Sequence, residues 1–284
     1  MPSLASYRRS NKLQALVFGG YKSGKTAGAA TFPNSVIIDC DKGIGTLTNP
    51  NLARFGYEKK VVHYEQFKDA ERTNRGVVTK HTAFDNVCKY FDEWMKPAGK
   101  WPNPDGTVTD TGRDKFETWI IDSGTTLGDY AKAKAIILLG GTDFSAKPLS
   151  HTHAAAVRTG MIVPKLQDFG AERSMLEQFI DMLLDSDKHV VLLSHEREQW
   201  EGEPPNEKIV AITPMFTGQS AERIPLKFEE VWNLRVMKEG TGWRRYLQTE
   251  ADGLRKCGSR LGLPDKTPFE FEVISKALNL SGVK

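Results

Sequence analysis

The sequence has few cysteines, no long apolar run and little net charge, and each of these absences excludes a class of protein. Its three cysteines, Cys40, Cys88 and Cys257, are far apart and form no C-x-x-C pair, so neither a disulfide framework nor a zinc site is predicted. No apolar stretch approaches the roughly 20 residues that cross a bilayer. Residues 1–9 lack the apolar core of a signal peptide. We therefore expect a cytoplasmic protein without membrane contact.

The overall composition is that of a soluble folded chain. Of its 284 residues, 39% are hydrophobic and 26% are charged, and the formal net charge is +3. This length suits one large α/β domain with insertions. The mild positive charge permits a nucleic-acid partner but does not argue for one, so any binding function must be read from local segments.

The most informative motif is a Walker A phosphate loop. Residues 19–26 read GGYKSGKT and fit the pattern G-x-x-x-x-G-K-[ST]. An apolar run at 13–18 leads into the motif as a strand, and small residues at 26–30 leave it as the start of a helix. In such a loop, backbone N–H groups point at phosphate oxygens and the helix N-terminus adds partial positive charge. A chance glycine-rich turn would not have a strand before it and a helix after it, so the sequence predicts nucleoside triphosphate binding.

Individual positions of the loop have expected roles. The residues expected to bind the nucleotide are Gly19, Gly20, Tyr21, Lys22, Ser23, Gly24, Lys25 and Thr26. Lys25 is expected to reach the β- and γ-phosphates, which makes it a candidate catalytic residue, and Thr26 is expected to ligate Mg²⁺. ATP and Mg²⁺ are therefore the expected ligands.

Apolar strands alternate with amphipathic helices along the chain. Strands are expected at 35–41, 61–64, 116–123 and 189–195, helices at 84–94, 127–139 and 175–183, and further strands at 208–213, 228–237 and 243–249. This alternation predicts an α/β fold. Its central sheet is expected to be mostly parallel and flanked by helices, with antiparallel strands toward the C-terminus.

The expected core spans residues 13–250, between an N-terminal arm at 1–12 and a C-terminal segment at 251–284. Residues 98–115 are rich in Gly, Pro and Asp, and they are expected to form a surface insertion containing a hairpin. Residues 140–170 read as a long irregular segment, which we expect to be a mobile loop.

Three polar residues are expected at the carboxyl ends of parallel strands, where the ligands of such sheets bind. Asp122 ends the apolar strand at 116–123, the Walker B pattern, and is expected to hold Mg²⁺; the alternative is an acid that caps the next helix. Asp41 is expected to orient the attacking water or, alternatively, to stabilise the turn at 42–43. His195 is expected to sense the γ-phosphate or, alternatively, to be a core histidine.

Together these motifs resemble the RecA-type ATPase core. The resemblance covers residues 13–250 and rests on Walker A, IDCD at 38–41, WIIDS at 119–123 and LLSH at 192–195. More narrowly, the chain resembles short phage-encoded RecA-like ATPases, including single-strand annealing proteins of the Sak type. In that family the strand after the first helix ends in a catalytic carboxylate, usually glutamate, and a later strand ends in a polar residue, commonly glutamine. The resemblance implies these roles for Asp41 and His195.

The resemblance also implies two mobile loops beside a bound DNA strand, at about 140–170 and 197–218. The residues expected to contact DNA are Lys147, Arg158, Lys165, Phe144, Phe169 and Trp200. The first loop combines basic side chains with aromatic rings, which suits a sequence-tolerant single-strand groove. The second loop, a polar one that contains Trp200, is rich in glutamate, which repels phosphate, so a solvated loop is an equal alternative there.

RecA-like cores stack head to tail, so a homo-oligomer, either filament or ring, is expected. In it Arg255, Lys256 and Arg260 would reach a neighbour's γ-phosphate, unless they form only a basic, solvated tail.

These features favour a DNA-stimulated ATPase that binds single-stranded DNA and promotes annealing or recombination in phage DNA metabolism, in the host cytoplasm. A single-strand binding protein is a further expected partner. The alternative is a P-loop motor or switch, such as a helicase, loader or packaging accessory, without strand-pairing activity. The sequence contains no N-K-x-D motif, which argues against a GTPase.

Overall fold

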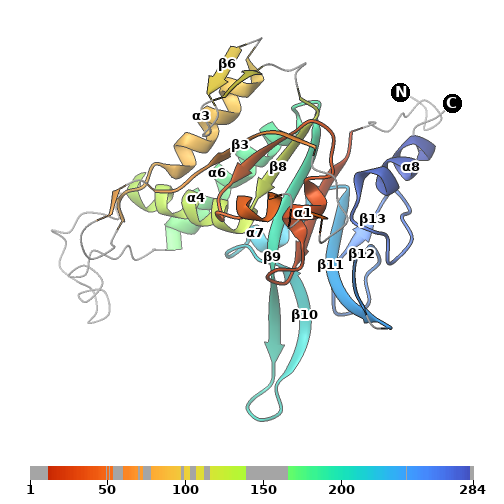
Figure 1. The fold of residues 1–284 in the computed structure, drawn as a ribbon. Coiled ribbons are helices and arrows are strands. Elements are labelled where there is room, and N and C mark those ends of the chain that lie inside the picture. The colour runs from red at the N-terminus through yellow and green to blue at the C-terminus, as the bar shows by residue number, and fades with distance from the viewer. Residues whose placement is uncertain are drawn as a thin grey trace, which may run out of the picture.

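A central sheet with helices on both faces forms the fold of this chain (Figure 1). The computed structural model describes residues 12–48, 50, 52–53, 60–69, 71–72, 78–96, 99–102, 107–111, 116–138, 166–240 and 242–281. Within these residues the main sheet has nine strands, and two further pairs of short strands lie apart from it.

The strands of the main sheet follow the order β12-β11-β1-β9-β8-β2-β3. All neighbours from β11 to β3 run parallel, whereas β12 runs antiparallel to β11. The strands are β1 Gln14–Gly19, β2 Ser35–Asp39, β3 Val61–Gln66, β8 Thr118–Asp122, β9 His189–Glu201, β11 Glu230–Glu239 and β12 Gly242–Gln248. The predicted fold class is therefore confirmed.

Side chains of the parallel strands alternate between two apolar cores. One core receives Leu16, Ile38, Trp119 and Leu192. The other receives Val17, Ile37, Ile120 and Leu193. Because both faces are covered, these strands read as nearly continuous apolar runs in the sequence.

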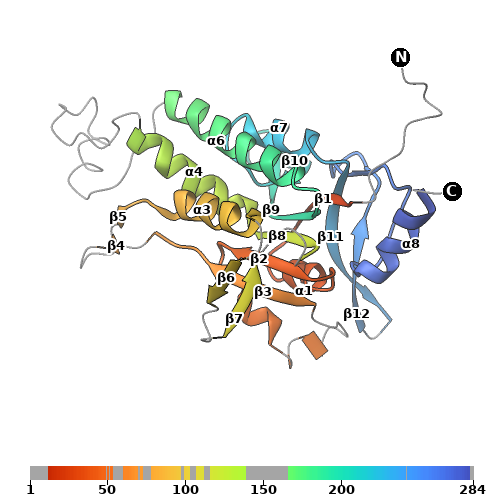
Figure 2. The same cartoon turned by 90° about the horizontal axis from the view of Figure 1, so that it is seen from above.

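Helices fill the two sides of the sheet unequally (Figure 2). The first core is closed by α3 Ala83–Met95, α4 Gly124–Leu138, α6 Leu166–Leu184 and α7 Ser220–Leu226. The second is closed by α1 Lys25–Ala29, the 3₁₀ helix η2 Ile44–Leu47 and α8 Phe271–Ser281. Phe269 is buried beside α1, and the backbone N–H of Phe271 donates to Thr31 Oγ1 at 3.0 Å, so the C-terminal segment docks on the core.

Short strand pairs extend the structure beyond its core. β10 Lys208–Pro214 pairs with β9, and β13 Gly258–Ser259 pairs with β11, both antiparallel. The separate pairs are β4 Glu71–Arg72 with β5 Val78–Lys80, and β6 Gly99–Pro102 with β7 Val108–Thr111. The β6–β7 pair is the hairpin that the sequence predicted in the insertion.

Two predictions about loops were wrong. The polar loop expected around Trp200 is a hairpin, because β9 continues to Glu201 and pairs with β10, with Trp200 opposite Ile209. Backbone pairing holds these polar residues as a strand although they have no apolar face. The irregular segment expected at 140–170 does not extend to residue 170, since α6 begins at Leu166 and includes Phe169, and the rest of that segment lies outside the described residues. Asp168 in the first turn of α6 favours this start through the helix dipole.

Candidate active site

The phosphate loop lies between the end of β1 and the first turn of α1. Lys25 is buried there, and its Nζ donates hydrogen bonds to the carbonyl oxygens of Gly19 at 2.8 Å and Gly20 at 3.0 Å. Burial lowers the pKa of Lys25, whereas nearby carboxylates, Asp122 above all, oppose this shift. The loop thus holds a buried cation, for which an anionic phosphate is a natural partner.

Neighbouring strands pack tightly against the first two glycines of the loop. A Cβ atom on Gly19 would lie 2.6 Å from the carbonyl oxygen of Leu234 in β11. A Cβ atom on Gly20 would lie 3.2 Å from Glu196 Oε1, and Glu196 in turn accepts a hydrogen bond from Asn233 Nδ2 at 3.2 Å. Larger residues would push the loop away from β9 and β11.

The expected Mg²⁺ ligands meet at the end of β8. Thr26 Oγ1 donates to Asp122 Oδ2 at 2.6 Å. Burial raises the pKa of Asp122 to about 6, although the hydrogen bond from Thr26 opposes this shift. The hydroxyl and the carboxylate converge as the P-loop chemistry of Mg²⁺ requires, so these two residues fit the ion.

Asp41 is held from two sides. Its Oδ2 lies 2.9 Å from His195 Nε2, and its Oδ1 accepts a hydrogen bond from Thr126 in α4. Burial opposes ionisation of Asp41, but hydrogen bonds from His195, Thr126 and Ser123 outweigh it and lower the pKa of this carboxyl. The structure therefore brings Asp41 and His195 together, as the sequence predicted, although β2 ends before Asp41 and β9 continues past His195.

The turn after β2 is stabilised by Asp39 and not by the side chain of Asp41. Asp39 is buried, and its carboxylate accepts hydrogen bonds from the backbone N–H groups of Asp41 at 3.1 Å, Gly43 at 3.0 Å and Ile44 at 3.3 Å. Asp39 thus performs the turn-stabilising role that the sequence left open for Asp41. The Asp41 side chain instead lines the nucleotide cavity.

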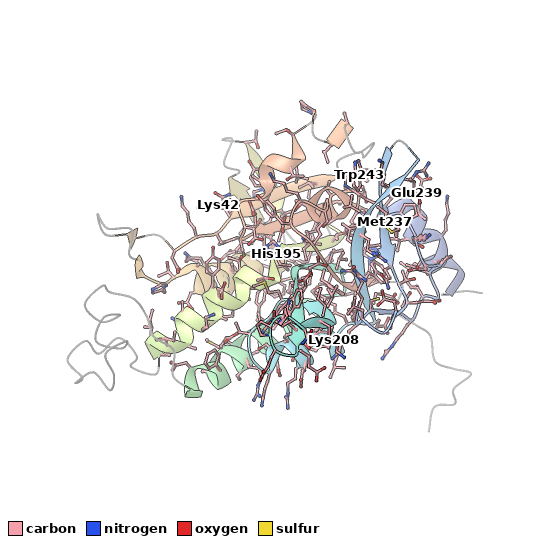
Figure 3. The ribbon with its side chains drawn as sticks, turned by 90° about the horizontal axis from the view of Figure 1, so that it is seen from below. Lys42, His195, Lys208, Met237, Glu239 and Trp243 are labelled. Carbon is pink, nitrogen blue, oxygen red and sulfur yellow. The ribbon has the colours of Figure 1, made fainter. Side chains whose placement is uncertain are left out.

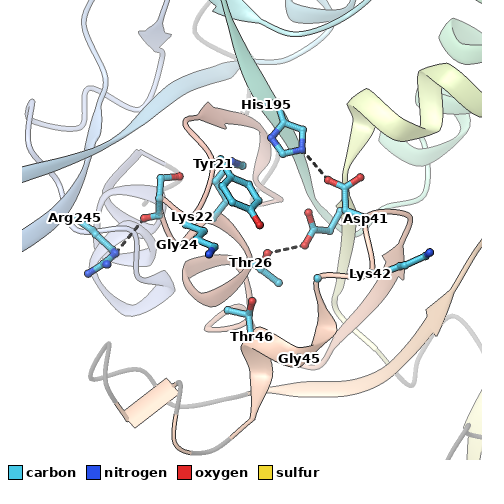
Figure 4. A pocket seen from close by; sticks show the side chains of 14 residues that line it. Tyr21, Lys22, Gly24, Thr26, Asp41, Lys42, Gly45, Thr46, His195 and Arg245 are labelled. Carbon is cyan, nitrogen blue, oxygen red and sulfur yellow. Dashed lines mark hydrogen bonds and ion pairs between the residues drawn. The ribbon is translucent and has the colours of Figure 1, made fainter.

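These groups surround one cavity of about 630 Å³ (Figure 4). It is lined by Tyr21, Lys22, Ser23, Gly24, Lys25, Thr26, Asp41, Lys42, Gly43, Gly45, Thr46, Asp122, His195 and Arg245. Sequence reasoning missed Arg245, whose Nε donates to the carbonyl oxygen of Ser23 at 3.1 Å. Only the pairing of β12 with β11 brings this residue to the phosphate loop.

A comparison with known protein families matches residues 11–261 to the AAA domain. The chain belongs to this family. The match and the complete phosphate loop identify a P-loop ATPase domain. No curated protein matches the sequence significantly.

Two solved structures are similar to this AAA domain. A KaiC-like protein from the hyperthermophilic archaeon Pyrococcus horikoshii OT3 is 12% identical, with a TM-score of 0.40 over 88% of this chain and 90% of that one. The RadB recombinase is 14% identical, with a TM-score of 0.36 over 93% of this chain and 87% of that one.

Two of the six residues expected to contact DNA lie among the residues that the structure describes. Lys147, Arg158, Lys165 and Phe144 lie outside the described residues. Phe169 is partly buried within α6, and Trp200 is exposed on the β9–β10 hairpin.

In the parts of the chain that the structure describes, no helix has both the length and the apolar character needed to span a membrane.

The three residues expected to act on a neighbour differ in their surroundings. Arg255 forms an ion pair with Asp252 of the same chain, with 3.0 Å between Nη1 and Oδ2. Lys256 and Arg260 are exposed. Their action in trans stays a prediction. Arg260 also has a partner in its own chain, since its Nη1 lies 4.0 Å from Glu229 Oε1, so exposure and the lack of a recorded ion pair among the described residues favour Lys256.

Proposed function

We propose that this AAA domain hydrolyses ATP with Mg²⁺ and couples hydrolysis to binding of single-stranded DNA, in annealing or recombination. One observation carries the proposal: Asp41, at the phosphate cavity, is held by both α4 and β9 through Thr126 and His195. A change at the γ-phosphate therefore acts on two elements that lead away from the site.

Each residue of the site has a part in the proposed hydrolysis. Lys25 binds the β- and γ-phosphates, and Thr26 and Asp122 hold Mg²⁺. The ion, when bound, neutralises charge on the phosphates. Asp41 stays ionised because its pKa is low, so it accepts a hydrogen bond from the attacking water and orients it rather than removing its proton early. His195 fixes the carboxylate for this task.

Two routes lead from Asp41 to the expected DNA surfaces. Thr126 lies in the first turn of α4, which ends at Leu138, just before the segment with Lys147, Arg158 and Lys165. His195 lies on β9, which continues to the exposed Trp200. These connections support a DNA affinity that depends on the bound nucleotide.

The test is ATP hydrolysis measured with and without a single-stranded oligonucleotide. Lys25→Ala is expected to abolish productive binding and turnover, whereas unchanged turnover would place the chemistry elsewhere. Thr126→Ala is expected to keep ATP binding but to lose stimulation by DNA. Lys134→Ala is the matched control on the same helix, because Lys134 pairs with Asp85 on α3 and does not touch the site. Equal stimulation of Thr126→Ala and the parent would refute the route through α4.

A second candidate function follows from the charge of the β9–β10 hairpin. Its exposed acidic residues are Glu198, Glu201, Glu203 and Glu207. This group of glutamates repels phosphate and suits a basic protein partner, which favours a motor or switch without strand pairing. Electron microscopy with single-stranded DNA and a non-hydrolysable ATP analogue separates the two: a filament on DNA supports the first function, and a closed ring or a monomer supports the second.

A further inference from the structure

Two β-hairpins, β9–β10 and β11–β12, extend past the phosphate loop, one on each side of it. β1 ends at Gly19, which pairs with His195, while β9 continues six residues further to Glu201. On the other side, Phe18 pairs with Asn233, and β11 continues to Glu239 before β12 returns. Both hairpins project downward in Figure 1, and in the view from below Lys208 and Trp243 lie on different sides of His195 (Figure 3).

The two ends of the cavity are lined by different residues, the proposed catalytic groups at one end and Arg245 at the other. Asp41 and His195 mark the γ-phosphate end of the proposed reaction. Arg245 approaches the phosphate loop from the other side and contacts Ser23 (Figure 4). Because a nucleoside triphosphate is an extended molecule with its nucleoside at one end, the nucleoside must lie away from Asp41, toward the side that Arg245 closes.

Trp243 stands on the same face of β12 as Arg245. Residues two apart on a strand point the same way and lie about 6.6 Å apart. Trp243 is 65% exposed, and it precedes Arg245 on the part of the hairpin that rises beyond the loop. Arg245 lines the cavity and Trp243 does not, so the ring stands two residues along the strand from the lining, and a large exposed ring at that place suits stacking of a planar base.

We infer that the β11–β12 hairpin is the nucleoside-side wall of the ATP site. Arg245 supports Ser23 and places its positive charge beside the phosphate nearest the ribose, and Trp243 stacks on the purine base. This inference rests on the proposed function, since it assigns the part of the same site that sequence motifs did not reach.

The two parts of ATP can be tested separately, because inorganic tripolyphosphate has the phosphates of ATP without the nucleoside. Trp243→Ala is expected to weaken binding of ATP and ADP about tenfold, the scale of one lost base–aromatic stack, and to leave tripolyphosphate affinity within about twofold. Arg245→Ala is expected to weaken both ATP and tripolyphosphate, because it removes a charge near the phosphates. Unchanged tripolyphosphate binding also shows that Trp243→Ala keeps a folded phosphate loop.

Leu226→Ala is the control, because Leu226 is a large apolar side chain that is 81% exposed on α7 and does not line the cavity. It is expected to bind ATP and tripolyphosphate like the parent. An unchanged ATP affinity in Trp243→Ala, or a selective loss of single-stranded DNA binding instead, would overturn the inference. If the parent protein itself bound no ATP, the proposed function would fail, and the two failures are therefore distinguishable.

Discussion

At the scale of single residues, the site depends on which of two nearby carboxylates faces the nucleotide. Asp39 is occupied by three backbone N–H groups and by Gln66, whose Nε2 lies 3.2 Å from its Oδ2. The Asp41 carboxylate is instead hydrogen-bonded by side chains from other parts of the chain, namely His195 and Thr126 and also Ser123. One acid therefore shapes the turn, and the other is presented to the cavity.

The first prediction concerns Asp41→Asn. The amide keeps the shape of the side chain but removes the charge that orients water, so hydrolysis is expected to fall by about 10²-fold or more while ATP affinity stays near that of the parent. Single-turnover hydrolysis and equilibrium binding measure the two effects. Hydrolysis at the parental rate would mean that Asp41 only braces α4 against β9.

The second prediction follows from the raised pKa of Asp122. Mg²⁺ needs the ionised carboxylate, so Mg²⁺-dependent ATP binding is expected to weaken as the pH falls through about 6. Asp122→Asn is expected to bind Mg²⁺-ATP weakly at every pH and to lose this pH dependence. Titrations of both proteins with ATP between pH 5 and 8 check this. A parental affinity that stayed constant across that range would contradict the assignment of Asp122 to the ion.

The raised pKa of Asp122 also means that its ionised form lowers the stability of the fold when no Mg²⁺ is bound. The folded state holds the Asp122 proton more tightly than the unfolded chain, so burial of the charge destabilises the fold above pH 6, and this penalty disappears as the pH falls toward 4. Two pKa units correspond to about 3 kcal/mol. Asp122→Asn is therefore expected to raise the free energy of unfolding by up to about that amount at pH 8 and by little near pH 4, as denaturant unfolding can measure.

At the scale of elements, the sequence predicted those parts of the site that depend on local pattern. The phosphate loop and the gathering of Asp41, Asp122 and His195 at one edge of the sheet were predicted because apolar runs and glycines are local signals. Of these three residues only Asp122 ends its strand, because β2 ends at Asp39 and β9 continues to Glu201. Arg245 was not, because only the register of β12 against β11 brings it to Ser23. The extension of β9 was missed for a similar reason, since its partner strand, and not its own side chains, makes it a strand.

The third prediction compares two helical glycines. A Cβ atom on Gly28 in α1 would lie 2.2 Å from Cδ1 of the buried Phe269, whereas one on Gly170 in α6 would meet nothing within 4 Å. Gly28→Ala is therefore expected to lower the free energy of unfolding by about 1–3 kcal/mol and to weaken ATP binding, because α1 must move. Gly170→Ala is expected to raise it by about 0.5–1 kcal/mol. Denaturant unfolding of both variants measures these changes. Equal changes in the free energy of unfolding would show that the C-terminal segment does not constrain α1.

At the scale of the whole molecule, the proposed coupling joins a buried chemical site to surfaces on distant elements. Asp41 lies between α4 and β9, so loss of the γ-phosphate would act on both elements together and not on one loop. Most charged side chains of the β9–β10 hairpin are acidic, so the positive charge that the proposed DNA binding needs must come from elsewhere in the chain. The segment after α4 contains the basic residues that the sequence offers for this purpose.

The last prediction tests that segment through the salt dependence of DNA binding. Each phosphate neutralised on a single strand contributes about 0.7 to the slope of log affinity against log salt, so replacing Lys147, Arg158 and Lys165 together by alanine is expected to flatten the slope by roughly 2 in the presence of ATP. Affinity should fall similarly for all base sequences, because phosphate contacts do not read bases. Lys134→Ala serves as the control for loss of one positive charge on α4. An unchanged slope in a triple variant that still binds ATP would exclude this segment as the DNA site and favour the motor or switch function.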